Sequence, residues 1–255
     1  MEAKRVKSNS SGELLEFGSL NKRGQKGNII TVIAAYNEEN RISPIVKNCL
    51  RFSKKVIVID DGSIDSTADV ARSLGALVVK HKKNLGKGNA IRTAIETLKN
   101  NKTEVIVFID ADGQDNPDFI PKLAEPILHG KADLAIGSRF IQDGKSAIPE
   151  YKVFGNQILT FITNLFTGFS NPVKESQCGF RAIRRDKLLD LNLRSNRFEI
   201  ESEMIIEAAK SQLKIVEVPI KDNLVQEAIE KGTTILDGLK IVFALLRITF
   251  QKFLS

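Results

Sequence analysis

Two stretches decide the fold: Val56-Ile57-Val58-Ile59 followed by Asp60-Asp61-Gly62-Ser63, and Val105-Ile106-Val107-Phe108-Ile109 followed by Asp110-Ala111-Asp112-Gly113-Gln114. Each is a continuous apolar run that ends in acidic residues. Such runs are typical of strands buried on both faces of a parallel sheet. Ligands of these sheets bind beyond the carboxyl ends of the strands. The two acidic clusters are therefore predicted to face one crevice.

Strands and helices alternate on either side of these stretches. The expected strands cover residues 28–35, 55–59, 76–80, 105–109 and 132–136. The expected helices cover residues 42–52, 88–98 and 117–128, with another that Ser63 or Asp65 caps and that ends near residue 74. This rhythm predicts an α/β fold with a mainly parallel, doubly wound sheet and helices on both faces.

The alternation of strands and helices becomes less regular after residue 137. Helices are expected at 152–167, 199–211 and 235–253, and strands at 177–183 and 214–218. We expect one domain over residues 28–230, preceded by a mobile polar tail at 1–27 and followed by an amphipathic helix within 231–255.

The composition is that of an ordinary globular protein of 255 residues, with 42% hydrophobic and 27% charged residues. The net charge of +7 favours an anionic partner, such as a nucleotide or a phospholipid surface. Because the basic residues are scattered and no nucleic-acid-reading module occurs, we expect no nucleic-acid partner. Cys49 and Cys178 lie far apart without metal-ligand spacing, which fits a reducing, cytoplasmic compartment.

Asp110 and Asp112 leave the end of a strand on the same side, because alternate residues of a strand share a face. Paired carboxylates are oxygen ligands for a hard divalent cation, which in turn could hold a diphosphate. The alternative is a solvated turn signalled by Asp112-Gly113. The second acidic strand end, at Asp60 and Asp61, favours the metal site.

Two further features suit a nucleotide. An aspartate at the end of a strand can accept a hydrogen bond from a base N–H or a ribose hydroxyl, although it can also cap the next helix. The run Asn84-Leu85-Gly86-Lys87-Gly88-Asn89 precedes a helix, where backbone N–H groups and the helix dipole attract phosphate. It is neither a Rossmann fingerprint nor a Walker A sequence. Neither His81 nor His129 has a catalytic setting.

The ordered set of motifs resembles the family 2 glycosyltransferases of GT-A fold, specifically the dolichyl- and polyprenyl-phosphate sugar synthases of mannosyl and glucosyl type. The resemblance covers about residues 28–220. The motifs that carry it are Thr31-Val-Ile-Ala-Ala-Tyr-Asn-Glu-Glu39, Asp60-Asp-Gly-Ser-Ile-Asp65, Asn84–Asn89, Asp110-Ala-Asp-Gly-Gln114, Gly137-Ser-Arg-Phe140, Gln177-Cys-Gly-Phe-Arg181 and Glu217-Val-Pro-Ile220.

This resemblance implies a role for each matching residue. Ala35, Tyr36, Glu38, Asp60, Asp61, Lys87, Asp110, Gln177 and Arg181 would bind the nucleotide sugar. Asp110, Asp112 and Gln114 would hold Mg²⁺ or Mn²⁺. Arg139, Lys152 and Asn156 would bind the acceptor, and the groups at the reacting centre would be Asp112, Arg139, Glu201 and Glu203.

The implied reaction is an inverting, metal-dependent transfer of a hexose from a nucleotide sugar of GDP-mannose or UDP-glucose type to dolichyl or polyprenyl phosphate. One alternative keeps the donor and uses a soluble or saccharide acceptor, but the charge-free segment 153–169 favours a lipid. A sugar-phosphate nucleotidylyltransferase would carry a Gly-rich loop after the first strand, where this chain has Ala-Tyr-Asn-Glu-Glu. A non-catalytic membrane scaffold has no need of Asp-Ala-Asp.

No segment has the 20 or so predominantly apolar residues that a spanning helix needs. We instead expect peripheral binding to the cytoplasmic face of an anionic membrane, through segment 153–169 and the last helix. In that helix Lys240, Arg247 and Lys252 can reach the headgroups. The alternative is that it packs on the sheet or on a second copy of the chain in a homo-oligomer.

Overall fold

The computed structural model describes residues 28–141 and 150–221, with the side chains of 150–152 left out. The expectations for the tail at 1–27, the helix within 231–255 and the side chain of Lys152 fall outside these residues. Within the described residues no helix is long and apolar enough to cross a membrane.

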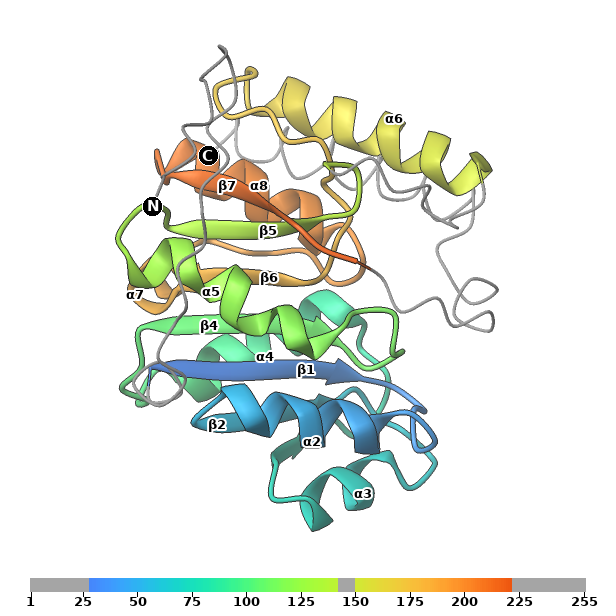
Figure 1. Ribbon diagram of the computed structural model, residues 1–255. Coiled ribbons are helices and arrows are strands. Elements are labelled where there is room, and N and C mark those ends of the chain that lie inside the picture. The colour runs from blue at the N-terminus through green and yellow to red at the C-terminus, as the bar shows by residue number, and fades with distance from the viewer. Residues whose placement is uncertain (1–27, 142–149, 222–255) are drawn as a thin grey trace, which may run out of the picture.

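A seven-stranded sheet with the order β3-β2-β1-β4-β6-β5-β7 forms the centre of the described part (Figure 1). All neighbouring strands are parallel except β6, which runs antiparallel to β4 and β5. The expectation of a mainly parallel sheet is thus confirmed. The strands are β1 (Ile29–Ala35), β2 (Lys55–Asp60), β3 (Leu77–Lys80), β4 (Val105–Asp110), β5 (Leu134–Ser138), β6 (Arg181–Arg184) and β7 (Ile215–Pro219).

Helices cover both faces of this sheet, as the alternation predicts. In Figure 1, α2 and α5 lie in front of the sheet, and α4 and α8 lie behind it. In α2 the residues Ile42, Ile45, Val46 and Cys49 follow helical spacing and are all buried, so one face of the helix rests on the core. The helices are α2 (Ile42–Phe52), α3 (Thr67–Ser73), α4 (Lys87–Leu98), α5 (Ile120–Leu128), α6 (Glu150–Phe166), α7 (Arg185–Asp190) and α8 (Ile200–Lys210), with a 3₁₀ turn, η1 (Pro117–Phe119).

The apolar runs behave as expected of central strands. Val56 to Ile59 of β2 and Val105 to Ile109 of β4 are buried throughout, because helices cover both faces of the sheet. In the register Ala35 pairs with Asp60, and Ala34 pairs with Asp110. The carboxyl ends of β1, β2 and β4 therefore meet at one edge, at the right in Figure 1.

Several elements differ from expectation, among them the strand expected at 132–136, which is β5 at Leu134–Ser138. The strand expected at 177–183 begins only at Arg181, because the residues before it fold around the Arg181 guanidinium. Helix α3 begins at Thr67, whose amide donates to Asp65 Oδ1 at 3.0 Å, so Asp65, one of the two expected caps, does contact the first turn. Helix α7 was not expected, because its six residues are too few to show a period.

Candidate active site

Asp60 ends β2 at the shared edge of the sheet. Its Oδ1 accepts a hydrogen bond from the Ser63 amide at 2.8 Å. Its Oδ2 is buried and has no hydrogen-bond partner among the described residues, although Lys80 Nζ lies 3.5 Å away. Burying a polar atom without a partner is costly. This oxygen is therefore placed to accept a hydrogen bond from a ligand.

Asp61 supports the turn beside it. Its carboxylate accepts hydrogen bonds from the amides of Leu85 and Gly86 at 2.9 and 2.7 Å, and Oδ1 lies 2.7 Å from His81 Nδ1. His81 Nε2 lies 2.9 Å from Thr93 Oγ1, so the ring ties β3 to α4. Through these contacts the Asp61 and His81 side chains hold the turn before α4 in place.

The residues that follow β1 are tied to the loop after β2. Asn37 has a φ of 54°, its amide donates to Ser63 Oγ at 2.9 Å, and its Oδ1 accepts from the Ile64 amide. This link holds Ala35 and Tyr36 at the shared edge. The Tyr36 side chain remains 45% exposed and is open to a ligand ring. Glu38 forms an ion pair with Arg41.

The turn before α4 packs closely on the loop before α8. A Cβ on Gly86 would lie 2.5 Å from Asn196 O, and one on Gly88 would lie 2.2 Å from Ser195 O. Glu203 fixes that loop by accepting the Ser195 amide at 2.8 Å. Its carboxylate thus supports the loop, although the sequence resemblance implied a place at the reacting centre.

Asp110 and Asp112 end β4 next to this turn. Burial and the neighbouring charge of Asp110 raise the pKa of Asp112 to about 6. The hydrogen bond that the Gln114 amide donates to Asp112 opposes this rise. Two carboxylates that repel each other in this way form a natural place for a cation. Within the described residues no group of three or more His, Cys, Asp or Glu could hold a metal.

Lys87, the first residue of α4, reaches the same acids. Its Nζ lies 2.7 Å from Asp110 Oδ2 and 2.6 Å from Glu201 Oε1 on α8. Burial opposes the charge on this lysine, but the attraction of the two carboxylates outweighs it and raises the pKa of the ammonium. The structure thus brings Lys87, Asp110 and Glu201 together, residues that lie far apart in the sequence.

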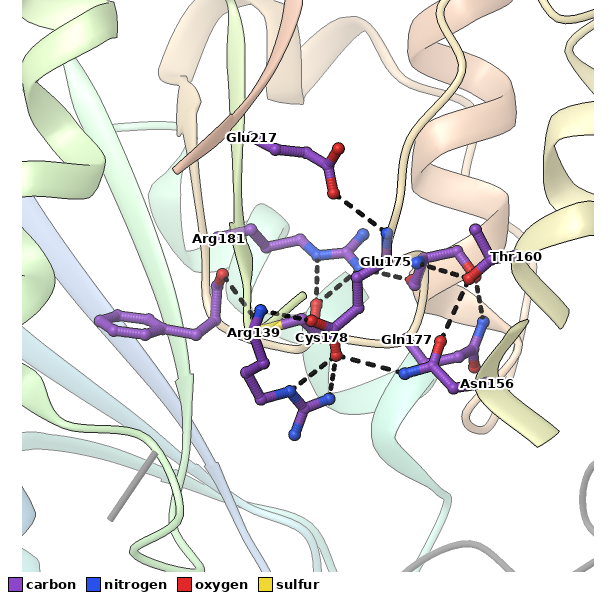
Figure 2. A network of polar contacts seen from close by, with 10 residues as sticks. Arg139, Asn156, Thr160, Glu175, Gln177, Cys178, Arg181 and Glu217 are labelled. Atoms are coloured by element: carbon purple, nitrogen blue, oxygen red, sulfur yellow. Dashed lines mark hydrogen bonds and ion pairs between the residues drawn. The ribbon is translucent and has the colours of Figure 1, made fainter. Parts of the chain in front are cut away.

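A second cluster lies beyond the end of β5 and contains Arg139 (Figure 2). The backbone amide and the Nε of Arg139 each donate to the Glu175 carboxylate at 2.7 Å, and the guanidinium also forms an ion pair with it. Asn156 of α6 donates to the same carboxylate at 3.2 Å. Arg139 and Asn156, both expected at the acceptor, therefore lie together around a fully buried glutamate.

Glu175 is a residue that the sequence reasoning missed. It belongs to no motif, and no period marks it, so only the contacts reveal its place between Arg139 and Asn156. Glu217 lies on its other side and accepts the Glu175 amide at 3.0 Å.

The Gln177–Arg181 segment is held from inside. Arg181 is almost completely buried, and its guanidinium donates to the carbonyl oxygens of Ser176, Cys178 and Glu201 at 2.7–3.0 Å. Because these carbonyls occupy the guanidinium, we expect Arg181 to shape the segment rather than touch the donor. Gln177 Nε2 donates to Ser202 Oγ at 2.8 Å.

Helix α6 has a polar and an apolar face. On the inner face Thr160 Oγ1 accepts the Ser176 amide at 3.0 Å, and Thr163 Oγ1 lies 2.9 Å from Ser202 Oγ. Apart from Gln157, the exposed side chains described on this helix are large and apolar, at spacings of three and four residues: Phe154 65%, Ile158 43%, Phe161 59% and Leu165 57%. Such spacing forms one continuous stripe along a helix. We call these four residues the α6 stripe.

The fold is of GT-A type, as comparison with solved structures shows. A solved structure of glucosyl-3-phosphoglycerate synthase from Mycobacterium tuberculosis, with Mn²⁺, UDP-glucose and phosphoglyceric acid, aligns at a TM-score of 0.67 and 19% identity. The alignment covers 91% of this chain and 85% of that one. At this identity the likeness shows the fold.

Residues 30–191 match the family described as Glycosyl transferase family 2, and the chain belongs to that family. An uncharacterized protein of Methanocaldococcus jannaschii is 38% identical over 87% of this chain and 92% of its own length. A UDP-N-acetylglucosamine--dolichyl-phosphate N-acetylglucosaminyltransferase of Methanococcus voltae is 34% identical over 89% of this chain and 98% of its own length. The family and its relatives confirm the expectation of a hexosyltransferase similar to the polyprenyl-phosphate sugar synthases.

Proposed function

We propose that this enzyme transfers a hexose, with inversion, from a nucleotide sugar to the phosphate of a polyprenyl or dolichyl lipid. One observation carries the proposal: α6 exposes an apolar stripe, and its Asn156 meets Arg139 at the buried Glu175 carboxylate, beyond the end of β5 in the same sheet whose strand ends carry the acids suited to a metal. A soluble acceptor would give that helix no reason to expose four large apolar side chains.

The donor would bind along the ends of β1, β2 and β4. Asp60 Oδ2 would accept a hydrogen bond from a base N–H or a ribose hydroxyl, because it is a buried acceptor that lacks a hydrogen-bond partner among the described residues. The exposed Tyr36 ring could lie against the base. The first turn of α4 would present its positive dipole end to the diphosphate, joined by the Lys87 ammonium.

A divalent ion such as Mg²⁺ or Mn²⁺ fits the residues at the end of β4. Asp110 and Asp112 offer hard oxygen ligands, and their mutual repulsion leaves a demand for positive charge. Gln114 follows them in the same turn. When bound, the ion would stabilise the charge on the departing diphosphate. The donor phosphates would supply further oxygen ligands.

The acceptor would lie on the Arg139 side. A lipid phosphate is already ionised near neutral pH, so it can attack the sugar without a strong general base. Arg139 can offer a planar pair of donors to such a phosphate, and Glu175 orients the guanidinium. Asn156 and Lys152 belong to the same helix, α6, and would assist at the phosphate.

The lipid chain would reach this site from a membrane on which α6 lies. The α6 stripe would enter the boundary between headgroups and acyl chains, as amphipathic interfacial helices do. Binding at the cytoplasmic face of the membrane is part of this proposal, and the net charge of +7 favours an anionic surface.

Incubation with a panel of labelled nucleotide sugars tests the function and identifies the sugar. The panel contains UDP-glucose, GDP-mannose and UDP-N-acetylglucosamine, the last because it appears in the name of the Methanococcus voltae relative. Label should pass from one donor into the organic phase with polyprenyl phosphate, and the sugar–phosphate linkage should be of the inverted configuration. No organic-phase label with any donor, or retained configuration, would exclude the proposed reaction.

A further inference from the structure

The Lys87 ammonium lies deep between two elements that meet only in the folded chain. It bridges Asp110, a proposed metal ligand, and Glu201 on α8 at 2.7 and 2.6 Å. The backbone of Gly179 lies against this pair, since a Cβ there would come within 2.6 Å of Lys87 Nζ and 2.7 Å of Asp110 Oδ2. The ammonium therefore has little room and two fixed partners.

Lys87 occupies an oxygen that a metal would need. Its contact is with Oδ2 of Asp110, one of the two carboxylates in the proposed metal site. An ammonium and a divalent ion cannot both approach that oxygen closely, because like charges repel. Binding of the ion thus requires the ammonium to leave Asp110 or to share it at a cost.

Glu201 has the capacity to keep the ammonium when this happens. Its Oε1 already contacts Lys87, while its Oε2 is buried and lacks a hydrogen-bond partner among the described residues. A buried carboxylate oxygen without a partner is unfavourable, so a second contact with Lys87 would be stabilising.

We propose that Glu201 is a positioning residue that takes the Lys87 ammonium from Asp110 when a divalent ion binds. Lys87 holds the acids together without the ion, and with the ion it stays beside Glu201 and faces the donor diphosphate. This inference rests on the proposed metal site and assigns Glu201 a role through Lys87, with no direct contact to the sugar.

Mn²⁺ binding to the full chain, measured by electron paramagnetic resonance of the free ion without nucleotide, tests this exchange. Glu201→Gln removes one of the two carboxylates that pair with the Lys87 ammonium. The ammonium should then stay on Asp110 and compete with the ion, so Mn²⁺ should bind about tenfold more weakly. In Lys87→Met the competitor is gone, and Mn²⁺ should bind more tightly than to the wild type. In the double variant, Glu201→Gln should no longer weaken Mn²⁺ binding.

Glu207→Gln is the matched control, because Glu207 also lies on α8 and pairs with a lysine, Lys210. It should change Mn²⁺ affinity by less than about twofold. Thermal unfolding of each variant checks that the fold is kept. If Lys87→Met does not fold, Lys87→Gln replaces it in the cycle.

A loss of affinity in Glu201→Gln that persists without Lys87 would mean that Glu201 acts as a simple negative charge, and the proposal would fail. It would equally fail if the wild type binds no Mn²⁺. Transfer of sugar to polyprenyl phosphate is measured separately, so a wild type that binds Mn²⁺ with this coupling but labels no lipid overturns the proposed function alone.

Discussion

At the scale of single residues, Asp112 is the first test of the metal site. Asp112→Asn removes one ligand charge, so transfer should fall by at least about 100-fold while the fold is kept. Turnover with and without added Mg²⁺ or Mn²⁺ measures the effect. Asp118→Asn is the control, because Asp118 is exposed and pairs with Arg51 away from the site. Near-normal turnover of Asp112→Asn in EDTA would remove Asp112 from the metal site.

Variants of Arg139 test whether this residue serves acceptor binding or donor binding. Arg139→Ala would leave the buried Glu175 without its charge partner and cost about 3–5 kcal/mol of stability. Arg139→Lys keeps the charge and loses the planar pair of donors, so it is the sharper variant. The acceptor KM should rise about tenfold, with donor Kd changed less than about twofold. An equal loss of donor binding would move Arg139 to the donor site.

The individual site residues were predictable to different degrees. The acids at the ends of β2 and β4 could be found because a buried strand followed by carboxylates is a local pattern. The supporting roles of Asp61, Glu203 and Arg181 could not, because they arise from contacts with backbone groups on other segments. The place of Glu175 could not be predicted for the same reason.

At the scale of elements, the α6 stripe carries the membrane proposal. Phe161→Glu with Leu165→Glu should sharply reduce binding to liposomes of acidic lipid, because both side chains are more than half exposed and apolar. The fold should survive, since neither side chain belongs to the core. Co-sedimentation measures the bound fraction.

Ile64→Glu is the control for the stripe, because Ile64 is 92% exposed but lies in the loop before α3. It should leave pelleting unchanged. Unaltered pelleting of the α6 double variant would exclude the stripe as the membrane contact.

The elements themselves followed the sequence closely wherever one period governed them. Strands β1, β2 and β4 and helices α2 and α4 lie within a residue or so of their expected bounds. The segment before β6 did not, because a buried arginine that draws carbonyls around itself leaves no periodic signal. The direction of β6 likewise depends on which neighbours it meets across the sheet.

At the scale of the whole molecule, the charge of +7 should act together with the apolar surfaces. Each basic residue near an anionic surface contributes about 1 kcal/mol, so liposome binding should weaken as salt is added. A chain that ends at Gly232 should pellet less than the full chain, because it lacks Lys240, Arg247 and Lys252. Equal pelleting of the two forms would exclude residues 233–255 from membrane binding.

A competition between acceptors tests the central claim most directly. The enzyme receives its labelled donor, a divalent ion, and equal amounts of polyprenyl phosphate and phosphoglyceric acid, the latter bound in the similar Mycobacterium tuberculosis structure. We predict label in the organic phase, lost when EDTA removes the ion. Label that remains in the aqueous phase on phosphoglyceric acid, or organic label that is undiminished in EDTA, would contradict a metal-dependent sugar transfer to a lipid phosphate.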